Sequence, residues 1–159
     1  MIGIIEREKL NQSDKAKITP HIEYLEKELS FLEQYQKEID WKIYQSNRSK
    51  RLEVERWVEC IINATLDVSK MFLTIRGESI PDTSREVLFL ISSRIYDKEE
   101  EAETFSELAR IRNTLAHRYL DIRWQDIKRF FELAPRLYPP FLEYMKKELE
   151  RQRNNQAGF

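Results

Sequence analysis

The chain has 159 residues, which is enough for one domain with a single hydrophobic core. It is 41% hydrophobic and 35% charged with only 3 Gly and 5 Pro, so we expect a few long helices and exclude a β-sandwich with many turns. The formal net charge of −1 provides no global basic field to recruit nucleic acid, so any such binding must come from a local patch.

Cysteine usage and hydropathy favour a cytoplasmic protein. Cys60 is the single cysteine, so no disulfide framework can form within the chain. The two histidines, His21 and His117, are far apart in sequence, so we expect neither a metal site nor another cofactor. Residues 1–10 place four charged residues directly after their isoleucines, unlike a signal peptide. No apolar run approaches the roughly 20 residues of a membrane span, so no membrane partner is expected.

The first helix is expected over residues 19–44. Thr19 and Pro20 supply a hydroxyl cap followed by proline at the first helical position. Apolar residues then recur at helical spacing through Ile39, which predicts one buried stripe. The polar residues 1–18 before this helix are expected to form an N-terminal extension, either mobile or a short extra helix.

A second helix is expected over residues 51–75, after a polar turn at residues 45–50. Its apolar face, from Val54 to Phe72, is wide enough for a central helix with one side available to a second protomer. Gly77 is a natural stop, because glycine readily adopts the left-handed conformation that ends many helices.

Two further helices are predicted by capping signals. Residues 79–82 and 83–86 both match a capping box and predict a third helix that ends near Tyr96. Residues 97–100 repeat the signal and predict a fourth helix.

The fifth helix is expected over residues 124–151, bent or broken at its prolines because proline cannot donate a helical hydrogen bond. These prolines are Pro135, Pro139 and Pro140. Residues 152–159 are expected to form a flexible tail. Short turns between long amphipathic helices predict an all-α, up-and-down antiparallel bundle of four to five helices, formed by residues 19–151.

The most informative segment is residues 112–119, RNTLAHRY, at the close of the fourth expected helix. On an ideal helix Arg112 and His117 would lie about 140° apart. They converge better if the helix ends near Ala116 and the chain then extends, in which case His117 and Tyr119 point to the same side. The surrounding residues 110–136 hold seven basic residues against three acidic ones, which provides a candidate local patch.

An arginine and a histidine permit RNA cleavage without a metal ion. Histidine can take the proton of a ribose 2′-hydroxyl or return one to the leaving oxygen, and a guanidinium stabilises charge developing at phosphorus. One histidine and one arginine are few for both proton-transfer roles, so a two-fold dimer that brings two copies together is expected. The residues alone leave a structural alternative open: Arg112 could form an ion pair, and His117 could cap the helix.

The pattern Arg112-x-x-x-x-His117-x-Tyr119 resembles the signature of HepT toxins, a branch of the HEPN superfamily. The resemblance covers about residues 20–150. Three further segments contribute to it: residues 54–57, 64–68 and 108–113. One difference is Arg118, which stands where that family often has a small residue and which adds positive charge.

The resemblance implies a homodimeric, HEPN-like bundle that acts as the toxin of a type VII-like toxin–antitoxin module. It implies an endoribonuclease site between protomers, with Arg112 and His117 catalytic and Asn113 supporting, acting on RNA such as tRNA or mRNA. It also implies a minimal nucleotidyltransferase antitoxin that transfers AMP from ATP to Tyr119. Candidate RNA contacts are Arg110, Arg118 and Arg123.

Two alternative functions remain open from the sequence. The chain could be a non-catalytic HEPN module that binds nucleotide or a nucleotidyltransferase partner, or a helical scaffold in which Arg112 and His117 satisfy each other. Trp57 and Trp124 could stack on bases, although core packing is favoured by their apolar surroundings. Asp67 interrupts an apolar face and could contact Arg112 or face solvent.

Overall fold

The structure is a computed structural model that describes the backbone of residues 2–157 and the side chains of residues 16–151. Within that part the secondary structure is helical, without strands. The helices are α1 (Ile2–Leu29), α2 (Leu32–Glu38), α3 (Trp41–Ser46), α4 (Arg48–Ile75), α5 (Ser84–Ile95), α6 (Glu99–Thr114) and α7 (Leu120–Ala157). The predicted all-α, antiparallel bundle is confirmed.

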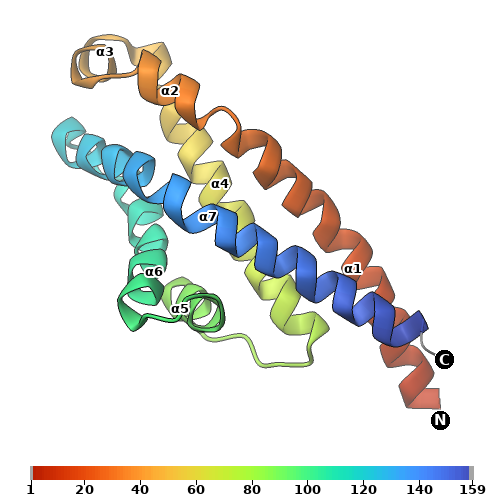
Figure 1. Ribbon diagram of the computed structural model, residues 1–159. Coiled ribbons are helices and arrows are strands. Elements are labelled where there is room, and N and C mark those ends of the chain that lie inside the picture. The colour runs from red at the N-terminus through yellow and green to blue at the C-terminus, as the bar shows by residue number, and fades with distance from the viewer. Residues whose placement is uncertain (1, 158–159) are drawn as a thin grey trace.

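The three long helices α1, α4 and α7 run along the length of the molecule, and both termini lie at one end (Figure 1). The short helices α2 and α3 form a corner at the opposite end, while α5 and α6 pack on the side away from α1 (Figure 1). Helix α4 contacts α1, α3, α5, α6 and α7, as expected of a central helix.

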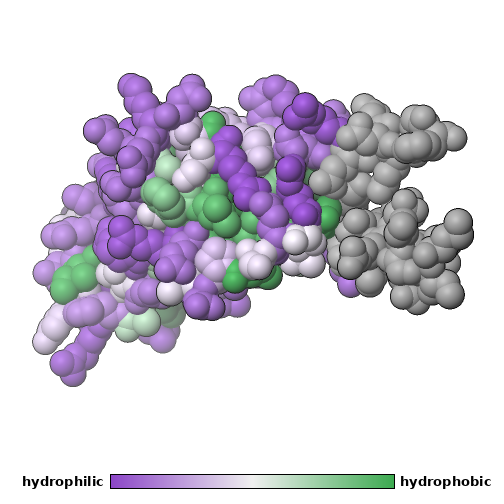
Figure 2. Space-filling view, turned by 90° about the horizontal axis from the view of Figure 1, so that it is seen from below, coloured by the Kyte–Doolittle hydropathy of each residue, from purple (hydrophilic) through white to green (hydrophobic). Residues whose placement is uncertain are grey.

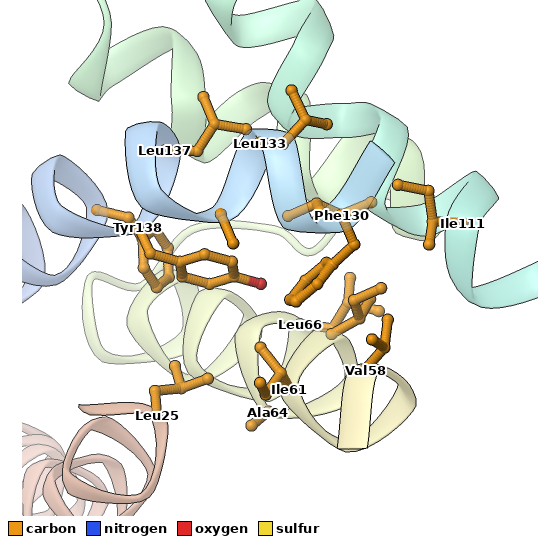
Figure 3. Packing of buried hydrophobic residues seen from close by; sticks show 14 of the residues in the cluster. Leu25, Val58, Ile61, Ala64, Leu66, Ile111, Phe130, Leu133, Leu137 and Tyr138 are labelled. Atoms are coloured by element: carbon orange, nitrogen blue, oxygen red, sulfur yellow. The ribbon is translucent and has the colours of Figure 1, made fainter. Parts of the chain in front are cut away.

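The core forms where α4 meets α7. Figure 3 shows Val58 and Ile61 of α4 beneath Phe130 of α7, with Ile111 of α6 closing one side. The fully buried hydroxyl of Tyr138 lies 2.8 Å from Thr65 Oγ1, so both polar groups have a partner within the core.

The predicted start of the first helix at Thr19 is wrong, because α1 begins at Ile2 and continues through Pro20. Its end also differs: α1 stops at Leu29, and α2 and α3 replace the rest of the expected helix. The Glu28 carbonyl accepts a bond from Phe31 N–H at 3.1 Å and another from Trp57 Nε1 at 3.1 Å. These bonds engage the carbonyl that would otherwise continue the α-helical hydrogen bonding.

Two polar side chains cap the starts of α3 and α4. Asp40 accepts a bond from Ile43 N–H at 2.8 Å and begins α3, where the sequence had suggested continuous helix. Asn47 accepts a bond from Lys50 N–H at 3.1 Å and begins α4 within the predicted polar turn. Gly77 adopts φ 70° just after α4, so the predicted stop is confirmed.

Of the predicted capping signals, the one at residues 83–86 forms: Thr83 Oγ1 accepts a bond from Glu86 N–H at 3.2 Å, and α5 begins at the next residue. The signal at residues 97–100 does not form as expected. The residue that precedes α6 is Lys98, whose side chain makes no capping bond, so the prediction of a capping box there is wrong although the helix itself is present.

Helix α7 begins at Leu120, earlier than expected, and is not broken at its three prolines. Burial of Leu133, Leu137, Tyr138 and Phe141 around those prolines offsets the helical hydrogen bonds that proline cannot make. The helix extends to Ala157, so residues 152–157 are helical; the predicted flexibility of the tail stays a prediction, and residues 158–159 lie outside the described part.

Figure 2 shows one face of the molecule, where apolar side chains gather near the middle and polar side chains surround them. No described helix combines the length and apolar character that a membrane crossing requires.

Candidate functional site

The RNTLAHRY segment begins in the last turn of α6 and ends at Tyr119, directly before α7. Arg112 lies in that last turn, and α6 ends at Thr114. His117 donates its backbone N–H to the Thr114 carbonyl at 2.8 Å, which tightens the turn as the chain leaves the helix. The expected helix end near Ala116 is therefore confirmed to within two residues, and His117 and Tyr119 lie in the connection to α7.

His117 is exposed, and one of its ring nitrogens already has a partner. Its Nδ1 accepts a bond from the Tyr119 backbone N–H at 3.2 Å. The two rings lie side by side, with centroids 5.3 Å apart, so His117 and Tyr119 share a side as expected. A neutral imidazole whose Nδ1 accepts a bond has its proton on Nε2, so this arrangement makes Nε2 the available donor.

Arg112 reaches across two neighbouring helices. Its Nη1 donates to Asn63 Oδ1 of α4 at 3.4 Å, and its Nη2 donates to Ser84 Oγ at the start of α5 at 3.3 Å. The predicted alternative of a contact with Asp67 is not found; Asp67 is exposed, one helical turn after Asn63. Both oxygens that Arg112 contacts are uncharged, so its positive charge is not neutralised there.

Two other arginines near the segment are bound to carboxylates. Arg123 Nη1 donates to Glu55 Oε1 at 3.1 Å, with side chains only 18% and 10% exposed, respectively. Arg110 Nη1 donates to Asp126 Oδ2 at 2.9 Å. We therefore assign Arg123, a candidate RNA contact from the sequence, to the α4–α7 interface, and Arg110 to a bond between α6 and α7.

Arg118 is exposed and lies over the ring of Tyr119, with its guanidinium carbon 5.4 Å from the ring centroid. Within the described side chains neither Arg112 nor Arg118 forms an ion pair. The local basic patch is thus smaller than the seven basic residues of the sequence suggest, and these two guanidiniums remain its uncompensated charges within the segment.

Glu55 is one of the residues near the segment whose role the sequence did not predict. In addition to Arg123 it accepts a bond from the Tyr44 hydroxyl at 3.0 Å, and burial together with the Glu55 charge raises the pKa of Tyr44. Arg123 donates its backbone N–H to the Tyr119 carbonyl at 3.3 Å. The buried carboxylate therefore fixes the first turn of α7 and, through it, the connection that holds Tyr119. The sequence around Glu55 offers no signal of this role, because Arg51 and Glu59, one helical turn before and after it, are charged as well.

The remaining candidates divide between surface and core. Tyr119 is 55% exposed and Asn113 is also exposed. Trp57 and Trp124 are buried, at 6% and 9% exposure, so they pack in the core instead of stacking on bases. No hydrogen bond joins Arg112 to His117, so the scaffold alternative, in which they satisfy each other, is not supported by this pair of described side chains.

A family model described as ribonuclease HepT-like matches residues 25–147. The chain belongs to the HepT-like ribonuclease family. The match covers α2 to α6 completely, together with most of α7, and it includes the whole RNTLAHRY segment. The HepT-like resemblance stated from the sequence is therefore confirmed. Comparison with curated proteins gives no match.

Proposed function

We propose that the chain is a metal-independent endoribonuclease toxin and that His117 and Arg112 are its catalytic residues. The observation that supports this most directly is the state of the two side chains in a HepT-like chain. His117 is exposed with Nδ1 held by a backbone N–H, and Arg112 is held by uncharged oxygens. Cleavage of a phosphodiester needs a group that transfers protons and a group that stabilises negative charge at phosphorus. An exposed imidazole and a guanidinium without an ion-pair partner can supply these two functions.

The proposed reaction uses a nucleophile from the substrate. The ribose 2′-hydroxyl loses its proton to one imidazole, its oxygen bonds to phosphorus, and the bond from phosphorus to the 5′-oxygen breaks. That oxygen receives a proton from a second donor, and a 2′,3′-cyclic phosphate remains. Arg112 would bind the nonbridging oxygens and stabilise their growing negative charge.

A homodimer would supply the second proton-transfer group. Only an imidazolium, which carries protons on both ring nitrogens, can return a proton to the leaving oxygen, so the ring that acts as the acid would first release the bond from Tyr119 N–H to Nδ1. A single chain offers one such ring in the segment, so His117 of a second copy would act as the base. This division of roles is the physical reason for proposing a composite site.

The proposed regulation acts on Tyr119. Its exposed hydroxyl would attack the α-phosphate of ATP in the site of a cognate minimal nucleotidyltransferase, forming a bond to AMP and releasing pyrophosphate. The AMP group would add bulk and negative charge beside His117 and Arg118, where an RNA phosphate would bind. We further propose that both proteins act in the cytoplasm and that the RNA cleaved by this chain is tRNA or mRNA.

The test of the activity is cleavage of RNA by the purified protein with a chelator present. The expected product has a cyclic phosphate, and an RNA with 2′-deoxyribose at the cleaved position should stay intact. Cleavage of that substituted RNA would refute 2′-hydroxyl attack. Binding of RNA or of the nucleotidyltransferase without any cleavage would favour the non-catalytic module instead.

The test of the regulation is the intact mass of the protein after coexpression with a nucleotidyltransferase of this kind. We expect mass increments of AMP in the parent and none in Tyr119→Phe. Equal modification of the two proteins would exclude Tyr119 as the acceptor.

A further inference from the structure

We propose that Asn63 and Ser84 are positioning residues that hold Arg112 through uncharged oxygens and so preserve its charge for an RNA phosphate. This inference rests on the proposed ribonuclease function. It assigns to α4 and α5 a role in the site that the RNTLAHRY segment alone does not reveal.

The three residues meet where three helices converge. Helices α5 and α6 are antiparallel, since Ser84 at the start of α5 contacts Arg112 at the end of α6, and Ser92 late in α5 donates to the Ala102 carbonyl early in α6. Asn63 approaches the same guanidinium from α4 at 3.4 Å. All three side chains are half-buried, so the guanidinium is directed by its surroundings while part of it stays accessible.

The uncharged character of these partners is what distinguishes Arg112. Arg123 and Arg110 have bonds of similar or shorter length, but their acceptors are the carboxylates of Glu55 and Asp126. A carboxylate beside a guanidinium competes with any incoming phosphate for the same donors. Asn63 has the shape of aspartate without its charge, so it can orient Arg112 without that competition.

Two substitutions can place a negative charge beside Arg112 without removing a side chain. Asn63→Asp replaces the amide oxygen with a carboxylate oxygen of nearly the same shape. Ser84→Asp places a carboxylate in the first turn of α5, where the helix dipole favours an acid and Thr83 still provides the cap. Each should strengthen the contact with Arg112, so neither is expected to lower the melting temperature.

The matched control is Asn47→Asp. It adds the same charge to α4, but at the N-cap, where aspartate caps as well as asparagine. Position 47 lies about 24 Å from position 63 along the helix axis. This variant should cleave RNA at the parental rate.

The experiment compares melting temperature, cleavage rate and RNA affinity among the parent and the three variants. Asn63→Asp and Ser84→Asp should each cleave at least about tenfold more slowly than the parent while melting at the same or a higher temperature. A purely structural role predicts that activity follows stability, so cleavage at the parental rate by both variants would overturn the proposal.

A second readout does not depend on cleavage. Affinity for an uncleavable RNA with 2′-deoxyribose at the cleaved position is measured against salt concentration. Loss of one phosphate contact should reduce the slope of log affinity against log salt by about 0.7 for a single strand. An unchanged slope in both variants would also contradict the proposal. Failure of the parent to cleave any RNA would instead refute the proposed function, so the two failures can be told apart.

Discussion

Whether a charged side chain in this protein can bind a substrate depends on the hydrogen-bond and ion-pair partners that it already has. Arg112 and Arg123 are eleven positions apart, yet one contacts an amide and a hydroxyl and the other a nearly buried carboxylate. The sequence identified Arg112 and His117 because their pattern is local. It could not identify Asn63 or Ser84, because those contacts join residues 49 and 28 positions apart.

Arg112→Lys tests the importance of the forked guanidinium. Lysine keeps a positive charge but loses the paired donors that fit a phosphate, so we expect cleavage to fall by about 10²-fold. The melting temperature should change little, since the bonds that Arg112 makes are long. The measurement is single-turnover cleavage alongside thermal unfolding, and cleavage at half the parental rate or more would count against a catalytic Arg112.

Glu55→Ala tests the buried ion pair. The change leaves the Arg123 charge without its partner in a nearly buried place, so the free energy of unfolding should fall by about 3–5 kcal/mol. Urea denaturation measures it. Glu59→Ala is the control, because its pair with Arg56 is exposed and should contribute less than about 1 kcal/mol. Equal losses in the two variants would show that the Glu55 pair has no special importance.

At the scale of helices, the sequence predicted roughly where most helices lie in the chain, but it did not predict several of the residues at which they begin or end. The apolar stripe of α4, the Thr83 cap and the Gly77 stop are local signals that the fold keeps. The predicted helix start at Thr19 was wrong because the sequence does not distinguish a proline at a helix start from a proline within a helix, such as Pro20. The break after Leu29 depends on Trp57, a residue of α4, and no local pattern contains that contact.

The connection between α4 and α5 predicts a dependence of stability on pH. Arg94 donates two hydrogen bonds to Glu78, at 2.6 and 2.7 Å, and these lower the pKa of that carboxyl below its ordinary 4.5. A carboxyl whose pKa is lower in the folded state adds stability above its unfolded pKa. It loses that contribution as the pH falls through the folded value.

Glu78→Gln should therefore melt at a lower temperature than the parent at neutral pH, and the two melting temperatures should converge as the solution is acidified below about pH 4. The effect at neutral pH should be at most about 1 kcal/mol, because Glu78 is 37% exposed and solvent screens the pair. Thermal unfolding across a pH series measures it. A constant difference at every pH would show that the ionised carboxylate is not responsible.

At the scale of the whole molecule, the bundle holds the RNTLAHRY segment between two fixed elements. Helix α6 is packed on α4 and α5, and the start of α7 is fixed by Glu55. The class of fold followed from composition and periodicity, whereas the exposure of His117 and the pairing of Arg123 depend on how the helices meet in space. The proposed composite site adds a further level, because it requires a second copy of this chain.

The proposed dimer predicts that activity depends on protein concentration. If His117 of each protomer has a different role at one site, the specific activity should fall as dilution separates the copies. Cleavage rate and sedimentation should be measured over the same concentration series, and the two transitions should coincide. Constant specific activity in a sample that sedimentation shows to be monomeric would contradict the composite site.

The most direct test of the account is cleavage of RNA by His117→Ala, compared with the parent in the presence of a chelator. Because the His117 side chain is exposed and its ring bonds to Tyr119 in the same connection, the variant should unfold at the parental temperature. This folded variant should leave RNA intact while the parent releases fragments with a cyclic phosphate. A folded variant that cleaves as fast as the parent would contradict the catalytic role proposed for His117.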